Sequence, residues 1–274
     1  MVLEGIINPF KAEKEPWELI PIGFVYCCVA IGLSLWIFRE QASMVMVFLI
    51  VLACVPLIYS TIKMEEEKDI DEEDEAILIK EHGKALMFFV CLFIGITLAV
   101  ALFYIILPDQ TAASVFSVQS KTITAVNAKV TGNFDSSVTI FSKIFFNNMR
   151  VMIFCLIFAL VYGAGAIFIL TWNATVIGVA IGNFVKIHLA NNYSYFHAAS
   201  LGLLRYFVHG IPEILGYFVA GLAGGIISIA IIKHDFRTKK FEHIMLDSVD
   251  MILLAVGILF LAALIEVYVT PLMF

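Results

Sequence analysis

The stretch KALMFFVCLFIGITLAVALFYIIL, residues 84–107, decides the fold of this chain. It carries no charged residue between Lys84 and Pro108. About 20 apolar residues are enough for a helix to cross the hydrocarbon core of a bilayer. A spanning segment must satisfy its own backbone N–H and C=O groups, and a helix does so. A membrane β-strand would alternate between apolar and polar residues over about ten positions. This stretch is apolar at odd and even positions alike. It therefore predicts a transmembrane helix.

Similar apolar stretches recur along the chain. Of its 274 residues, 61% are hydrophobic and 15% are charged, and the mean hydropathy is +0.97. A soluble domain carries roughly 25% charged residues, so the deficit is large. We predict an all-α, polytopic transmembrane bundle of about seven spans in the cell membrane, surrounded by lipids. The expected spans are 19–38, 43–62, 84–107, 149–171, 174–189, 214–232 and 248–270.

The composition also argues against several classes of function. The net charge of −6 comes largely from the segment 65–81, and no basic face is available for nucleic acid. The five cysteines lie in apolar runs without metal-ligand spacing, so we expect no metal, no cofactor and no disulfide framework. Signatures of serine hydrolases, zinc proteases and nucleotide-binding loops are absent from the sequence. We therefore expect no catalytic residue and no enzyme.

Polar segments divide the chain into four parts. Residues 1–107 form an N-terminal region of three spans, with an acidic cytoplasmic connector at 63–84 that we expect to be solvated and partly helical. Residues 108–133 are a polar loop outside the membrane, rich in Ser and Thr. Residues 134–232 form the core, and residues 233–274 hold a basic loop and the last span.

The core begins with an amphipathic pattern. Five residues that share one helical face are Phe134, Val138, Phe141, Phe145 and Asn148. We expect an amphipathic helix that lies in the membrane interface and leads into the fourth span. Only residues 172–173 separate the fourth span from the fifth, so these two spans should form a hairpin.

The distribution of Lys and Arg predicts the orientation. With the N-terminus in the cytoplasm, ten of these residues lie inside and seven outside, if residues 201–208 dip in and return on one side. The short loop that begins at Lys233 also holds Arg237, Lys239 and Lys240, and it is the strongest cytoplasmic signal. We therefore expect a cytoplasmic N-terminus and a C-terminus outside.

The segment His209-Gly210-Ile211-Pro212-Glu213 predicts a broken or re-entrant segment over 201–213. Pro212 lacks a backbone N–H and disfavours the α conformation at Ile211. Ionisable groups beside a break at membrane depth are candidates for function, so His209, Glu213 and Arg205 could bind an ion or a solute. The alternative is structural: Pro212 and Glu213 would start the sixth helix. His209 and Glu213 would then cap and brace the turn, and Arg205 could pair with Glu213.

Other residues have two interpretations as well. Glu266 lies near the end of the last span, where its carboxylate reaches the outer interface or relays protons. Gly163 and Gly165 mark the fourth span, and GxxxG spacings occur at 178–182 and 221–225. Such small residues predict close packing, either within the bundle or between copies in a homo-oligomer.

Several short motifs of the C-terminal half occur in a fixed order. They are Phe145-Phe146-Asn147-Asn148, Tyr162-Gly163-Ala164-Gly165, Trp172-Asn173-Ala174 with Ile177-Gly178, His209-Gly210-Ile211-Pro212-Glu213, and Ala220-Gly221-Leu222-Ala223-Gly224. Over residues 134–232 this set resembles the stage II sporulation protein M family, and the N-terminus looks more like archaeal members. The first three spans lie outside the resemblance. It implies structural roles for Asn147, Asn148, Gly163, Asn173, Gly178, Gly210, Pro212 and Gly221.

The resemblance also implies a function. The sporulation member of the family resembles a scaffold that recruits wall-degrading enzymes during engulfment. We therefore expect a non-enzymatic scaffold in membrane or envelope remodelling, with protein partners at the acidic connector. The alternative is an ion or small-solute transporter or channel that uses the segment around His209 to Glu213.

Overall fold

The chain folds into a bundle of long helices in a computed structural model that describes residues 15–71, 75–130, 137–191, 194–233 and 238–273. Within these ranges there is no strand, and seven helices are long and apolar enough to cross a membrane. The prediction of an all-α bundle with seven spans is confirmed. The elements are η1 (Pro16–Glu18), α2 (Leu19–Ile37), η2 (Arg39–Gln41), α3 (Ala42–Asp71), α4 (Glu75–Ile106), α5 (Asp109–Val115), α6 (Ser117–Val130), α7 (Ser137–Tyr162), α8 (Ala166–Ala190), α9 (Tyr195–Lys233), α10 (Lys239–Leu264), η3 (Ile265–Val269) and α11 (Thr270–Met273).

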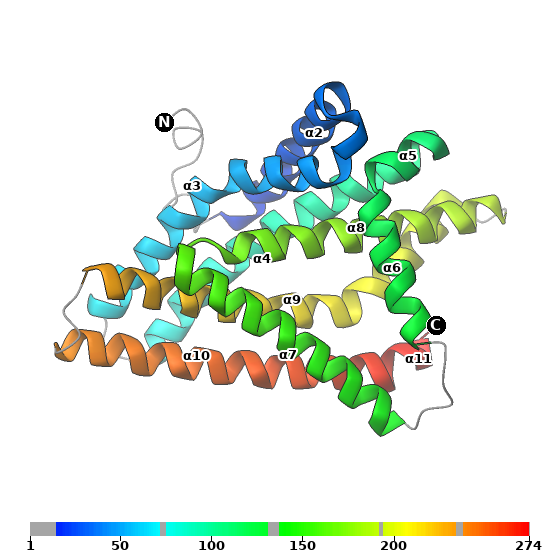
Figure 1. Ribbon diagram of the computed structural model, residues 1–274. Coiled ribbons are helices and arrows are strands. Elements are labelled where there is room, and N and C mark those ends of the chain that lie inside the picture. Colours follow the sequence, from blue (N-terminus) through cyan, green and yellow to red (C-terminus); the bar gives the residue numbers. More distant parts are fainter. Residues whose placement is uncertain (1–14, 72–74, 131–136, 192–193, 234–237, 274) are drawn as a thin grey trace.

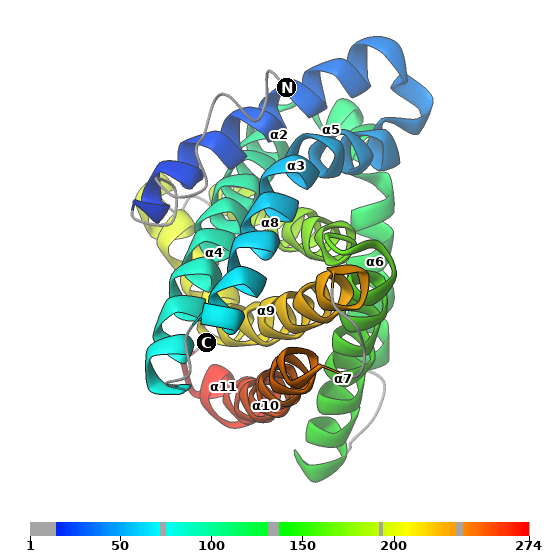
Figure 2. The ribbon, with the colours of Figure 1, turned by 90° about the vertical axis from the view of Figure 1, so that its left-hand side faces the viewer.

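Helix α9 lies at the centre of the bundle. It packs against α10, α7 and α8, while α4 packs against α8 and α2 (Figures 1 and 2). Seen along its axis, α9 lies between α8 and α10 (Figure 2). Most of its span from Gly210 to Lys233 is buried, whereas α7 and α10 keep large apolar side chains exposed, as expected for lipid-facing helices.

The sequence-based prediction of a broken or re-entrant segment over 201–213 is wrong. Helix α9 continues from Tyr195 through Pro212 to Lys233. It bends in its yellow part, as Figure 1 shows, without ending. A proline removes one backbone hydrogen bond and bends a helix, but packing neighbours hold the two halves together in a membrane bundle. Glu213 is consequently a mid-helix residue, and its proposed role at a helix start is wrong too.

The turn between the fourth and fifth spans also differs from the prediction. Helix α7 ends at Tyr162 and α8 begins at Ala166, so the hairpin turn is at Gly163 to Gly165. Gly163 has φ +66°, a left-handed conformation that glycine adopts without strain. Asn173, expected in the loop, lies inside α8, where its Nδ2 donates to Ile169 O at 2.8 Å. Hydropathy misses this turn because its residues are small and apolar.

The amphipathic stretch forms the first half of α7 and is not a helix of its own. Phe134 lies outside the described residues. Phe141 and Phe145 pack against Phe260 of α10, with ring centroids 5.2 and 5.8 Å apart. The phenylalanine stripe therefore contacts protein.

Two segments expected to be polar connections are helical and partly buried. Residues 109–130 form α5 and α6, and the buried Gln119 accepts a hydrogen bond from Ser43 Oγ at 2.7 Å. The acidic connector continues α3 and begins α4, which agrees with a partly helical segment. Glu65 and Glu66, however, are fully buried. The expectation of a solvated connector fails at these two residues.

Candidate functional site

Two residues of α9 begin the candidate site. Glu213 and Tyr217 are four residues apart, a spacing that places both on one face of a helix. The fully buried Tyr217 donates its hydroxyl hydrogen to Glu213 Oε1 at 2.7 Å. Glu213 itself is half-buried. The bond fixes the carboxylate against the interior of the bundle.

A second carboxylate comes from the end of α10. Glu266 lies in η3, a π-helical segment in which the backbone departs from the regular helix. Such turns re-aim side chains and often occur at functional sites. Segment η3 contacts α9, and Glu266 lies close to Glu213. We call these two residues the carboxylate pair.

Close contact between α9 and α10 holds the pair together. A Cβ added at Gly216 would lie 2.8 Å from Leu259 Cδ2 and 3.3 Å from Ala255 O. A larger side chain at Gly216 would force the two helices apart. The glycine therefore allows the approach that brings the carboxylates into one region.

Helix α7 adds a buried amide to this region. Asn148 is 4% exposed, and its Nδ2 has no hydrogen-bond partner. It lies on the buried stripe of α7, together with Cys155 and Ala159. Cys155 lies close to Tyr217, and a Cβ at Gly224 would lie 2.9 Å from Ala159 Cβ.

These contacts also show which part of α9 lies opposite Asn148. The residue numbers in both pairs rise together, so α7 and α9 run parallel. Counting back along both helices puts Asn148 opposite residues 210–213 of α9. The same half of α7 stays close to α10 through Phe145 and Phe260, and α7 also contacts η3. Asn148 therefore lies at about the level of Glu213 along the bundle.

The sequence-predicted residues are only partly brought together. Arg205 and His209 lie on α9, but their side chains lie outside the part of the structure that is described. Glu213 and Glu266, which sequence reasoning treated separately, share one region. Tyr217 and the role of Asn148 were missed. The i, i+4 spacing of Glu213 and Tyr217 is a signal that could have found the tyrosine.

A different charge cluster lies where α3, α4 and α9 meet. Glu65 accepts hydrogen bonds from Lys68 at 2.7 Å and pairs with His82 at 2.8 Å. Lys233, at the end of α9, pairs with Glu66 at 2.7 Å. We call these five residues the ion-paired end. Each buried carboxylate here has a basic partner, so the cluster connects three helices.

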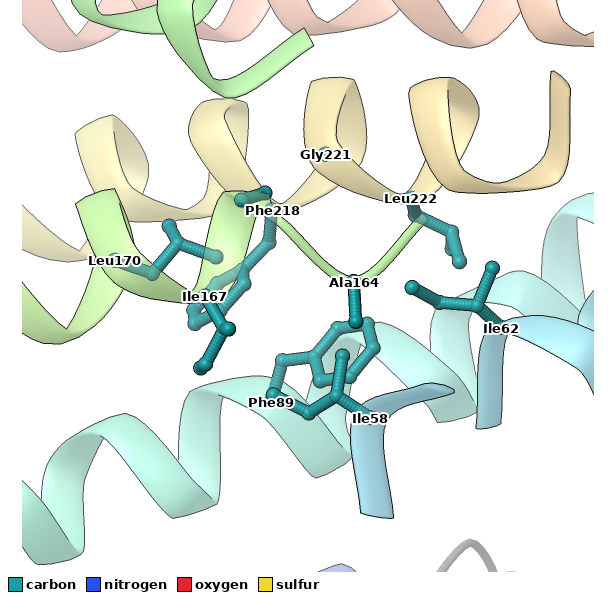
Figure 3. A pocket seen from close by; sticks show the side chains of 10 residues that line it. Ile58, Ile62, Phe89, Ala164, Ile167, Leu170, Phe218, Gly221 and Leu222 are labelled. Atoms are coloured by element: carbon teal, nitrogen blue, oxygen red, sulfur yellow. The ribbon is translucent and has the colours of Figure 1, made fainter. Parts of the chain in front are cut away.

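The interior between these two regions is closely packed and apolar. Figure 3 shows a cavity lined by residues of α3, α4, α8, α9 and the turn at Gly163 to Gly165. Its volume is about 10 Å³. An apolar space of this size holds at most one water and normally stays dry. The labelled residues are Ile58, Ile62, Phe89, Ala164, Ile167, Leu170, Phe218, Gly221 and Leu222.

Comparison with known proteins identifies the family. The family model of stage II sporulation protein M matches residues 84–271. The chain belongs to the stage II sporulation protein M family. No curated protein and no solved structure matches the chain. The family region is wider than the resemblance over 134–232. It includes α4 from Lys84 onward, which was expected to lie outside, and both members of the carboxylate pair.

In this member of the stage II sporulation protein M family, α2 and α3 precede the matched region. They are nevertheless packed closely onto it. A Cβ at Gly95 of α4 would lie 2.2 Å from Ile20 O of α2, and one at Gly23 would lie 2.5 Å from Leu92 O of α4. A Cβ at Gly225 of α9 would lie 2.8 Å from Ile62 Cγ2 of α3. The two N-terminal helices therefore form one bundle with the family region.

Proposed function

We propose that this chain is a non-enzymatic membrane scaffold that acts in membrane or envelope remodelling. The proposal rests on the close packing of the helices. A Cβ at Gly178 would lie 2.8 Å from Thr97 O, and one at Gly224 would lie 2.9 Å from Leu156 O. Backbones that approach this closely give a rigid bundle. A rigid bundle with small dry cavities suits a platform that holds other proteins in place.

The acidic connector is the proposed docking segment. Lys63 and Lys84 are exposed on α3 and α4, next to the ion-paired end that fixes both helices to α9. With a cytoplasmic N-terminus, as the Lys and Arg bias favours, this segment faces the cytoplasm. The C-terminus then lies outside. Labelling of single cysteines introduced at Lys63 and at Leu272 in intact cells tests this orientation, because only the residue outside should react with an impermeant reagent.

Photocrosslinking tests the scaffold role. A photoreactive residue is placed at Lys63 or Lys84, and a control at Ile157, whose exposed side chain lies on α7. A scaffold should give one discrete protein adduct from both connector positions and only lipid adducts from position 157. Protein adducts that are equally frequent at all three positions would count against the proposal, as would their complete absence at positions 63 and 84.

Transport of an ion or small solute is the second candidate function. The carboxylate pair favours it, since ionisable groups within membrane spans often lie on transport paths. Purified protein in liposomes tests it. Substrate-dependent flux that is lost in Glu213→Ala, with folding retained, would favour transport over the scaffold.

A further inference from the structure

The carboxylate pair has no counter-charge among the side chains that the structure describes. Among the side chains that the structure describes, neither Glu213 nor Glu266 has a basic partner, and the bond from Tyr217 supplies only a neutral hydroxyl. Two carboxylates that interact electrostatically in a low-dielectric region repel each other strongly. Both can stay ionised there only if a cation lies between them. Otherwise they must share a proton.

The groups around the pair are suited to hold a cation. Glu213 Oε1 accepts from Tyr217, which leaves Oε2 available. Glu266 adds two carboxylate oxygens, and Asn148 adds an amide that can donate through Nδ2 or accept through Oδ1. All of these are hard oxygen ligands, which bind hard cations. Among the described side chains, the other ionisable groups near the site are the Cys155 thiol and Arg150, whose side chain is exposed. His209 and Arg205 precede Glu213 by four and eight residues on α9, and their side chains lie outside the described part of the structure.

We propose that Glu213, Tyr217, Glu266 and Asn148 form a binding site for one monovalent cation, either a proton or Na⁺. The buried amide that lacks a partner is the second observation behind this site, independent of the carboxylates. A single positive charge lowers the charge of the pair from −2 to −1. The Tyr217 hydroxyl and the Asn148 amide then stabilise the remaining negative charge.

The number of ligands favours a monovalent ion. Ca²⁺ takes six to eight oxygen ligands, and Mg²⁺ requires a regular octahedron. The side chains at this site offer two carboxylates, one hydroxyl and one amide. A proton or Na⁺ needs fewer ligands. The site is compatible with either proposed function. A binding assay needs neither flux nor a protein partner, so it tests the site separately from both.

The test uses the full-length protein in lipid nanodiscs. Infrared spectroscopy detects a protonated carboxyl group at about pH 7, where exposed Asp and Glu are ionised. Radioactive sodium measures the binding of Na⁺ to the same preparation. The variants are Glu213→Gln and Glu266→Gln, and the matched control is Asp250→Asn, an exposed carboxylate on α10.

The wild type should show either the protonated carboxyl signal or about one bound Na⁺ per chain. Both glutamine variants should lose that signal, and Asp250→Asn should keep it. If the site exchanges the two ions, added NaCl should remove the infrared signal in the wild type. A wild type with neither signal, or a signal that persists in both glutamine variants, overturns the proposal.

Asn148→Ala tests the site without changing a carboxyl group, in case a glutamine variant does not fold. Loss of the buried amide should weaken the binding of the same ion about tenfold, the effect of one hydrogen bond of ordinary net strength. Asn147→Ala, which removes an amide at an exposed position of the same helix, should leave the affinity unchanged. Equal affinities of Asn148→Ala and the wild type would exclude Asn148 from the site.

Discussion

The ion-paired end and the carboxylate pair both hold acidic side chains inside the bundle, but they balance the charge in different ways. At the ion-paired end, the fully buried Glu65 and Glu66 pair with basic side chains at 2.7 to 2.8 Å. At the carboxylate pair, Glu213 has a tyrosine hydroxyl and a second carboxylate nearby. The first cluster is neutralised within the protein, whereas for the second we propose an ion from outside.

This difference indicates a structural role for the ion-paired end and a functional role for the carboxylate pair. A buried charge whose partner is supplied by the fold connects helices, and removal of one partner leaves an uncompensated charge. A buried charge without a partner costs stability and persists where it serves another role. The two regions should therefore respond in opposite ways when a charge is removed.

The largest effect is expected from Lys233→Met at the ion-paired end. The substitution leaves Glu66 buried beside an apolar side chain, and should lower the free energy of unfolding in detergent by about 2 kcal/mol. The lysine side chain is 31% exposed, so we expect less than for a fully buried pair. The double variant with Glu66→Leu should recover most of the loss, because an apolar pair replaces the ion pair.

Lys239→Met is the control for this prediction, since Lys239 is exposed at the start of α10. It should unfold as the wild type does. If Lys233→Met were equally stable, the ion-paired end would contribute nothing to stability and the contrast with the carboxylate pair would fail.

Tyr217→Phe should have the next largest effect. It removes the buried hydroxyl that donates to Glu213, a bond to a charged group with a net strength of about 1.5 kcal/mol. Thermal unfolding should detect this loss. Tyr59→Phe is the matched control, because the Tyr59 side chain is 47% exposed. Equal effects of the two substitutions would show that the hydroxyl of Tyr217 does not hold Glu213.

The sequence predicts more of the fold than of the site. Seven spans follow from hydropathy because hydrocarbon imposes one strong requirement on the backbone. The turn at Gly163 to Gly165 does not, since these residues are as apolar as the helices they separate. The continuity of α9 through Pro212 depends on the helices packed around it, which local sequence rules do not include.

The site depends on contacts between helices distant in sequence. Glu213 is recognisable as an ionisable residue in a span, but its interaction with Glu266 depends on how α9 packs against α10. The burial of Glu66 likewise depends on Lys233, which follows it by 167 positions. A run of acidic residues therefore looks solvated in the sequence even where the fold supplies the counter-charge.

Gly216→Ala probes the helix contact beside the carboxylate pair. The added methyl group meets the end of the Leu259 side chain at 2.8 Å, so that side chain must move. We expect a loss of about 1 kcal/mol in the free energy of unfolding. Gly257→Ala on α10 is the control, because nothing lies within 4 Å of its Cβ. It should be neutral, or more stable by about 0.5 kcal/mol.

The smallest effect is expected from Glu213→Gln. The sign of its change in the free energy of unfolding distinguishes the carboxylate pair from the ion-paired end. Glutamine keeps the size of the side chain and can still accept a hydrogen bond from Tyr217, while it removes one of two repelling charges. Unfolding measurements in detergent should show an unchanged stability or a gain of about 0.5 kcal/mol, in contrast to the loss expected for Lys233→Met. A loss as large as that of Lys233→Met would mean that the fold already supplies a counter-charge to Glu213. The carboxylate pair would then be a structural cluster like the ion-paired end.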